Sequence, residues 1–173
     1  MAGRRSLSLL LKSLSESDPL RSPKISQHHF RDSEQIGLLV KELEEDRLQY
    51  RADAKSWSVH DILAHLRSCA DLWTYSIYAM LAEKEPSFSD INERKWAKVT
   101  HYAEMPFNQS FQAYSLQRES LVRVLKDLPF DSWERSAMIF ARRHTVFIQM
   151  QRMAKHEIEH LEQIEAIVRE TRK

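Results

Sequence analysis

Apolar residues recur every three or four positions in four long segments of the chain, which is the spacing of one face of an α-helix. The first of these segments begins near Ser33 and extends to about residue 55. The second begins after Ser58 and extends to about Lys84. Ser58 and Asp61 have the spacing of a capping box, so the start of this second helix is well defined.

Two more amphipathic segments occupy the second half of the chain. Pro106 has the backbone angle that suits the first residue of a third helix, and Pro129 ends this helix. Thr145 can cap a fourth helix that runs to about Arg169. The loop between the second and third helices contains "INERKWAK", which predicts a short extra helix.

Neither strand-like alternation of useful length nor an internal repeat is visible, and "SAMIFARR" is the one place where a short strand could form. Only 2 glycines are present, and such a composition favours helices over hairpins. We therefore predict an all-α fold, an antiparallel four-helix bundle with a short extra helix in the loop between helices 2 and 3. We expect residues 1–22 to be a flexible N-terminal tail and residues 23–173 to form the bundle domain.

Charge and cysteine content narrow the classes of function. The formal net charge is +1 with both signs interspersed, which creates no field that would attract a nucleic acid. The single cysteine, Cys69, excludes an internal disulfide and fits a reducing cytoplasm. No apolar stretch of about 18 residues could span a bilayer. The Arg- and Ser-rich start resembles an export signal or a transit peptide, but Lys12 interrupts its leucine run. We expect a cytoplasmic protein that binds neither a membrane nor a nucleic acid.

A histidine pair stands near the C-terminus in the segment "MAKHEIEHLEQI". An α-helix turns about 100° per residue, so His156 and His160 lie roughly 40° apart on one helix face. Met153 and Ile164 lie within about 60° of the same line, which directs both imidazoles toward the bundle core. Burying a polar ring costs roughly 1–3 kcal/mol unless its nitrogens find partners, and a shared cation would supply one partner to each ring.

The histidine pair has two interpretations. In the first, each ring is satisfied separately by a core hydrogen bond or a surface carboxylate. In the second, the rings share a metal ion. His65 favours this interpretation, because it lies on an apolar face of the second helix and is a third histidine directed toward the core. Three neutral imidazoles leave open positions on an ion, which is typical of a catalytic site. Glu157 and Glu159 lie about 80° to either side of His156 and His160, so either could act as a base or hold a ligand ring.

The residues from His156 to His160 also form the HExxH string of zinc peptidases. Those enzymes need a third ligand downstream on a different element and an edge strand that binds an extended peptide. Here the chain ends 13 residues after His160, within the same predicted helix. A zinc peptidase is therefore the least favoured function.

Three motifs, "WSVHDILAHLRSCADLW", "INERKW" and "MAKHEIEHLEQI", occur in this order. Together they resemble the DinB-like (DinB/YfiT) superfamily over roughly residues 30–168. The resemblance implies a four-helix bundle that binds a divalent metal through three histidines, zinc or nickel being the usual candidates. Carried over to this chain, it makes His65, His156 and His160 the metal ligands.

The activities known in that superfamily are thiol-dependent, namely transfer of a thiol such as bacillithiol and isomerisation assisted by mycothiol. The resemblance thus implies a metal-dependent thiol S-transferase or hydrolase that acts on a small electrophilic molecule, with a low-molecular-weight thiol or water as nucleophile. The competing interpretation is a non-catalytic, stress-associated metal-binding bundle that acts through dimerisation. Either kind of protein is expected to be a homodimer.

Cys69 follows His65 by one helical turn and has three interpretations. It can be a metal ligand, a nucleophile or a small buried hydrophobe, and the last is favoured. From helical phase, the candidates for the lining of a substrate pocket are Gln149, Met153, Cys69 and Trp73.

Overall fold

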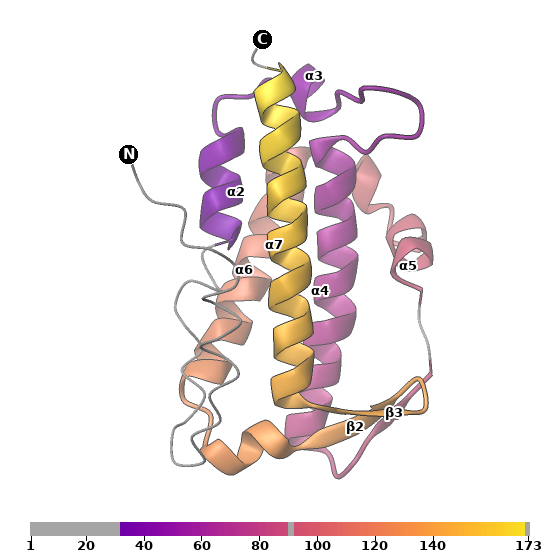
Figure 1. The fold of residues 1–173 in the computed structure, drawn as a ribbon, viewed down its shortest axis with the longest axis vertical. Coiled ribbons are helices and arrows are strands. Elements are labelled where there is room, and N and C mark those ends of the chain that lie inside the picture. The colour runs from indigo at the N-terminus through magenta and orange to yellow at the C-terminus, as the bar shows by residue number, and fades with distance from the viewer. Residues whose placement is uncertain (1–31, 90–91, 172–173) are drawn as a thin grey trace.

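The computed structural model describes residues 32–89 and 92–171, and a bundle of four helices makes up most of it (Figure 1). These helices are α2 (Asp32–Val40), α4 (Val59–Ala82), α6 (Phe107–Lys126) and α7 (Val146–Thr171). The predicted four-helix bundle is thereby confirmed. The predicted tail, residues 1–22, lies outside the described residues, so the domain boundary stays a prediction.

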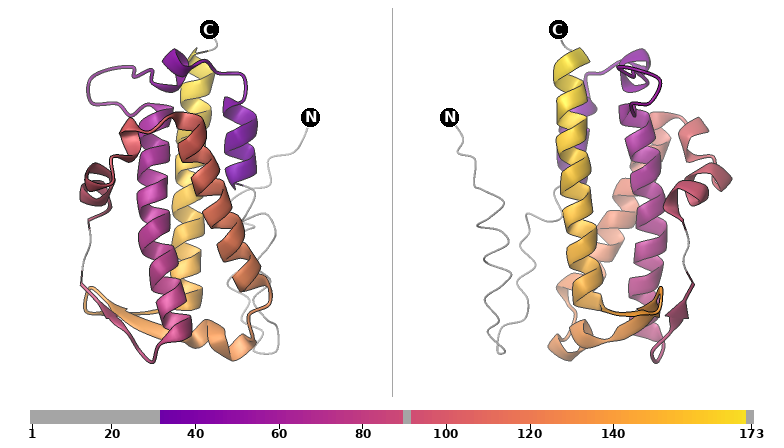
Figure 2. Two further views of the ribbon diagram at one scale, coloured as in Figure 1. Left: turned by 180° about the vertical axis from the view of Figure 1, so that it is seen from behind. Right: turned by 45° about the vertical axis from the view of Figure 1, so that its right-hand side comes forward.

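The helices of the bundle do not simply alternate in direction. α4 and α6 run away from the end of the molecule that carries α3 (Glu45–Leu48), whereas α2 and α7 run toward it (Figures 1 and 2). α4 is therefore antiparallel to α7 and parallel to α6. A parallel pair needs a long connection, which here contains β1 (Ser87–Phe88), α5 (Glu93–Val99) and the 3₁₀ helix η2 (Tyr102–Glu104). α5 is the predicted extra helix.

The first predicted helix is shorter than expected. The apolar pattern predicted one helix from Ser33 to about residue 55, but α2 ends at Val40, and α3 is a separate turn. In one continuous helix, Leu48 would lie roughly 120° from Ile36 and would face away from the core. Because the helix breaks, both side chains are buried, with exposed fractions of 4% for Leu48 and 1% for Ile36. Burial of the leucine thus overrides the local helical pattern.

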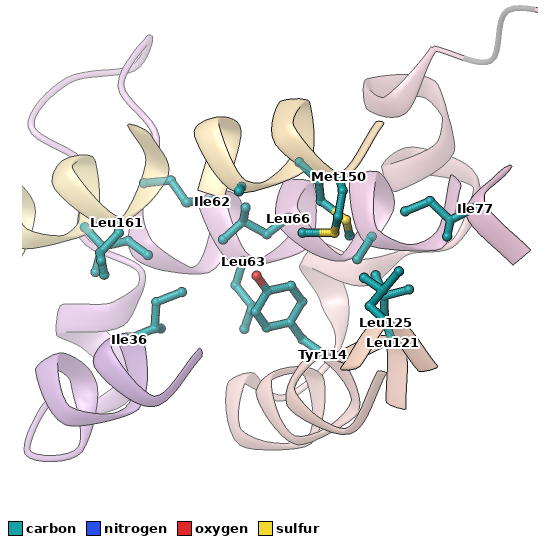
Figure 3. Packing of buried hydrophobic residues seen from close by; sticks show 14 of the residues in the cluster. Ile36, Ile62, Leu63, Leu66, Ile77, Tyr114, Leu121, Leu125, Met150 and Leu161 are labelled. Atoms are coloured by element: carbon teal, nitrogen blue, oxygen red, sulfur yellow. The ribbon is translucent and has the colours of Figure 1, made fainter. Parts of the chain in front are cut away.

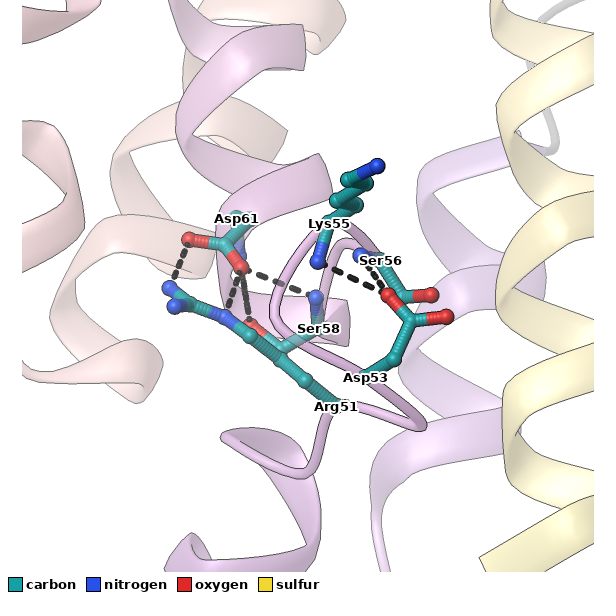
Figure 4. Close-up of polar contacts among 6 residues, drawn as sticks. All are labelled: Arg51, Asp53, Lys55, Ser56, Ser58 and Asp61. Carbon is teal, nitrogen blue, oxygen red and sulfur yellow. Dashed lines mark hydrogen bonds and ion pairs between the residues drawn. The ribbon is translucent and has the colours of Figure 1, made fainter.

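The predicted start of α4 is confirmed (Figure 4). The hydroxyl of Ser58 accepts a hydrogen bond from the backbone N–H of Asp61 (3.1 Å), and the Asp61 carboxylate accepts one from the backbone N–H of Ser58 (2.8 Å). Arg51 donates two bonds of 2.8 Å to the same carboxylate. Burial raises the pKa of Asp61, but the bonds from Arg51 and Ser58 outweigh it and lower the pKa overall. Asp61 therefore fastens the helix start to the loop before it.

A small sheet closes the end of the bundle where α7 begins (Figure 1). Strand β2 (Ser136–Ile139) pairs antiparallel with β3 (Arg142–Thr145) and parallel with β1. β2 lies in the "SAMIFARR" segment, so the mostly helical fold includes a sheet where the sequence left room for one. The turn residues Phe140 and Ala141 have φ angles of 58° and 56°. Hairpins usually reach this conformation with Asn or Gly, which is why the sequence did not predict the turn.

The core lies between the helices, along the axis of the bundle (Figure 3). Side chains from α2, α4, α6 and α7 contribute to it, and the predicted inward residues of α7 are all buried: Met150, Met153, Leu161, Ile164 and Val168. Thr145 caps α7 as predicted, since its hydroxyl accepts a hydrogen bond from the backbone N–H of Ile148 (3.1 Å). Among the described helices, none is long and apolar enough to cross a membrane.

Candidate metal centre

Three histidines from two neighbouring helices meet at one point of the bundle. His65 lies on α4, and His156 and His160 lie one turn apart on α7. The Nε2 atom of His156 is 3.1 Å from Nε2 of His65 and 3.1 Å from Nε2 of His160. The ring centroids of His65 and His160 are 4.9 Å apart. The structure thus brings together the three residues selected from the sequence, while their role as ligands stays a prediction.

A glutamine fixes the orientation of one of these rings. The amide oxygen of Gln163 lies 2.9 Å from Nδ1 of His160. A carboxamide oxygen can only accept a hydrogen bond, so Nδ1 carries the proton and Nε2 keeps its lone pair. The nitrogen that faces the other two histidines is therefore the one suited to bind a cation.

All three imidazoles are held in the neutral form. Burial lowers the pKa of His65 to about 4, and the charges of His160 and Arg94 act in the same direction. Burial, followed by the charges of His160, His65 and Arg152, lowers the pKa of His156 to about 3. The pKa of His160 is also lowered by burial, although its bond to a glutamine opposes the shift. At neutral pH the rings therefore offer lone pairs instead of positive charges.

The nitrogens of the three histidines face one another in a way that a shared cation would stabilise. Nε2 of His156 faces two other nitrogens, and one N–H cannot donate well to both. Nδ1 of His156, on the other side of the ring, is also buried without a hydrogen-bond partner among the described residues, and a cation at Nε2 would not supply one. Two nitrogens bound to one tetrahedral zinc ion are about 3.3 Å apart. The observed separations of 3.1 Å are close to this value, so the nitrogen of His156 and either neighbouring nitrogen are spaced as two ligands of one divalent ion would be.

Cys69 adds a sulfur atom beside the histidines. Its Sγ is 3.6 Å from Nε2 of His65 and 4.0 Å from Nε2 of His156. The donor atoms of His65, Cys69 and His156 all lie within 4.8 Å of one another, so this group could hold a metal ion. Burial, followed by the charges of Glu93 and Glu157, raises the pKa of the thiol and keeps it protonated without a cation. Cys69 is buried, as the sequence favoured, and it also faces the site.

Two tryptophans cover the histidine rings. Trp57 stacks on His160 with centroids 6.0 Å apart and planes 15° apart, and it lies 5.1 Å from the ring of His65. Trp73 meets His156 edge-on at 5.0 Å. The sequence indicated Trp73 as a pocket residue but did not connect Trp57 with the site. Trp57 precedes α4, so helical phase gives no direction for its side chain.

An open pocket of about 380 Å³ adjoins the site. Its lining consists of metal-ligand candidates, one tryptophan and four charged side chains: His65, Cys69, Trp73, Glu93, Arg152, Lys155, His156 and Glu159. Of the four lining residues expected from helical phase, Cys69 and Trp73 line this pocket. Gln149 and Met153 are instead 2% and 1% exposed and belong to the core, because the pocket opens outward from the bundle axis.

Glu157 binds to α6 on the core side of α7. One carboxylate oxygen accepts a hydrogen bond from Arg118 (2.9 Å), and the other accepts one from the hydroxyl of Tyr114 (3.1 Å). The side chains of Arg118 and Glu157 are only 5% and 4% exposed. Burial raises the pKa of Glu157, and Arg118 opposes that shift. Its role as a base stays a prediction, and no sequence pattern indicated Arg118 as its partner.

The sequence of the chain matches a known protein family. A family model of the DinB superfamily matches residues 2–164. The chain belongs to the DinB superfamily. The match includes residues that we assigned to the N-terminal tail, and it contains His65, His156 and His160.

One solved structure is similar to this DinB protein over nearly its whole length. It is YfiT from Bacillus subtilis, described as a probable metal-dependent hydrolase with an unusual four-helix bundle topology. The TM-score is 0.73 with 14% sequence identity, and the match covers 99% of this chain and 93% of that chain. At this identity the similarity supports the fold alone. None of the curated proteins matches the chain.

Proposed function

We propose that this DinB protein is a metal-dependent enzyme that acts on a small electrophilic molecule, with water or a low-molecular-weight thiol as nucleophile. The observation that carries the proposal is the meeting of His65, His156 and His160 beside an open pocket. A structural metal site needs no access from outside, whereas a catalytic site needs room for a substrate. The adjoining pocket of about 380 Å³ is large enough for a small molecule.

The donor set suits a divalent ion, with zinc or nickel as the candidates. We assign His65, His156 and His160 as its ligands and Cys69 as an additional donor. Neutral imidazole is a common ligand of both metals. When bound, such an ion supplies Lewis-acid chemistry, because it polarises an electrophile and lowers the pKa of an attacking water or thiol.

Other side chains orient and shield these ligands. Gln163 holds the ring of His160, and Trp57 and Trp73 exclude water from the imidazole faces. We propose a positioning role for Glu157, because its ion pair with Arg118 fixes the rotation of α7 about its own axis. His156 directly precedes Glu157 in the sequence, so this rotation sets the direction of its ring.

Hydrolysis and thiol transfer remain two candidate reactions of this one site. The description of YfiT favours hydrolysis, while the motif resemblance favours thiol transfer. A zinc peptidase receives no support, because Glu157, the glutamate of the HExxH string, is held by Arg118 and Tyr114. The non-catalytic bundle is the competing function, and the homodimer and the cytoplasmic location stay predictions for either.

A turnover assay separates the enzyme from the non-catalytic bundle. Metal-loaded protein is mixed with a panel of esters, amides, epoxides and alkyl halides, alone and with bacillithiol, mycothiol or glutathione. We expect at least one electrophile to be consumed in a reaction that a chelator or His65→Ala abolishes. Product analysis then distinguishes hydrolysis from thiol transfer. Metal-loaded protein that consumes no electrophile under either condition would contradict the proposed activity.

A further inference from the structure

One cation in the wall of the pocket has no carboxylate partner among the residues that the structure describes. Arg152 precedes His156 by one turn of α7, and its guanidinium lies 3.3 Å from Nδ1 of His144 and 3.4 Å from the amide oxygen of Gln149. Both contacts are long, and both partners are uncharged. No carboxylate of the described residues forms an ion pair with Arg152, so its charge is available to a ligand.

The other cation of the pocket differs in this respect. Lys155 lies on the same helix and also lines the pocket, but its ammonium is 3.9 Å from a carboxylate oxygen of Glu159. These two charges partly cancel at the pocket rim. Lys155 is therefore a natural control for Arg152. It has the same location and the same sign of charge, but unlike Arg152 it has a carboxylate partner.

A tryptophan connects Arg152 with the metal centre. The guanidinium carbon of Arg152 lies 5.8 Å from the ring centroid of Trp73, and the same ring lies 5.0 Å from the imidazole of His156. A ligand that packs on Trp73 therefore has donor groups for an anion at one end and the histidines at the other. Four residues, about 6 Å along the helix axis, separate Arg152 from His156.

We propose that Arg152 and Trp73 form a subsite for the anionic group of a small organic ligand, one helical turn from the metal centre. A guanidinium offers two parallel N–H donors to a carboxylate or a phosphate, which makes it suited to bind such a group. The assignment of this ligand as the substrate rests on the function proposed above. The binding of an anion at Arg152 does not depend on that function.

The negative charge of Glu93 orients the ligand in the pocket. Glu93 projects from α5 into the lining, and its charge acts on the thiol of Cys69. A negative group is therefore disfavoured beside Cys69 and favoured at Arg152. The anionic end of the ligand then points away from the metal centre, and its uncharged, reactive end points toward it.

Titration with three probes tests the subsite in purified protein of measured metal content. Benzoate and inorganic phosphate represent the two kinds of anion, and benzamide is the uncharged analogue of benzoate. Because a charge-assisted hydrogen bond contributes roughly 1.5–3 kcal/mol, we expect Arg152→Gln to weaken anion binding at least about tenfold. Lys155→Gln should leave it within about twofold. Benzamide should bind wild type no better than it binds Arg152→Gln.

The two anions identify the kind of ligand. Benzoate that binds more tightly than phosphate, and that loses affinity in Trp73→Leu, assigns the subsite to an organic carboxylate. Phosphate that binds more tightly, with no effect of Trp73→Leu, assigns it to a phosphorylated compound. The proposal is overturned if wild type binds neither anion, or if Arg152→Gln and Lys155→Gln have equal effects.

Measuring the metal content distinguishes a failure of the anion subsite from a failure of the proposed function. Arg152 is not among the metal-ligand candidates, so Arg152→Gln should retain as much metal as wild type. If the wild-type protein binds an anion but no metal, the subsite is supported and the metal-dependent activity is contradicted. Metal binding without anion binding would contradict the subsite alone.

Discussion

Burial of the imidazoles of His65, His156 and His160 makes the stability of the metal-free protein depend on pH. In the unfolded chain each imidazole has its ordinary pKa near 6.5, whereas in the folded protein the pKa values of His65 and His156 are about 4 and 3. Between these values the unfolded chain binds protons that the folded protein does not bind. The free energy of unfolding must therefore fall as the pH drops from about 6.5 toward 4.

We predict that metal-free protein unfolds at a lower urea concentration at pH 5 than at pH 7, and that His156→Gln shows a smaller decrease. The variant lacks the imidazole whose protonation opposes folding most strongly. His101→Gln serves as the control, because His101 is 66% exposed and should keep the full decrease. Equal midpoints at the two pH values in the wild-type protein would show that the buried imidazoles do not resist protonation.

At this scale the sequence could predict the histidines but not their surroundings. The spacing of His156 and His160 fixes their common direction, because the helical period is rigid. The partner of Glu157 depends on how α6 is rotated against α7, which no local pattern contains. The contact of Trp57 with the site likewise depends on a loop conformation, so it became visible only in the structure.

At the scale of elements, the buried pair of Arg118 and Glu157 joins α6 to α7. Removing one partner of such a pair leaves an uncompensated charge in the core, which typically costs 3–5 kcal/mol. We predict that Glu157→Gln lowers the free energy of unfolding by roughly 3 kcal/mol, measured by urea denaturation at pH 7.

The double variant Arg118→Met with Glu157→Leu is the matched control for this prediction. It removes both charges and replaces them with apolar groups, so it should be more stable than Glu157→Gln. If the single variant is as stable as wild type, the pair does not clamp α6 to α7, and the positioning role proposed for Glu157 fails.

The observed helix boundaries lie close to the predicted ones where a capping residue or a proline marks them. Ser58 and Thr145 cap their helices as predicted, because each supplies a specific backbone interaction. Pro106 is the N-cap of α6, one position before the first helical residue that it was expected to be. The break after Val40 was missed, since the gain from burying Leu48 depends on the whole core. β2 lies where the sequence allowed a short strand, but its hairpin turn was not predicted, because Phe140 and Ala141 are not residues that usually form such a turn.

At the scale of the whole molecule, we expect the chain to fold without a metal ion. The buried cluster extends over all four bundle helices and includes side chains far from the histidines, such as Ile36 and Leu125. A domain of this size needs no ion to form a core. We predict that removing the metal with a chelator leaves the helical circular dichroism unchanged and lowers the melting temperature only in proportion to metal affinity. Loss of helical signal on chelation would contradict this expectation.

The central claim is that His65, His156 and His160 bind one divalent ion together, and calorimetric titration with zinc tests it most directly. Wild type and the control His101→Ala should bind one ion per chain with equal affinity. Both His65→Ala and His160→Ala should bind at least about tenfold more weakly while keeping their helical content. Equal zinc affinity in all four proteins would contradict the claim and leave a DinB bundle without this metal centre.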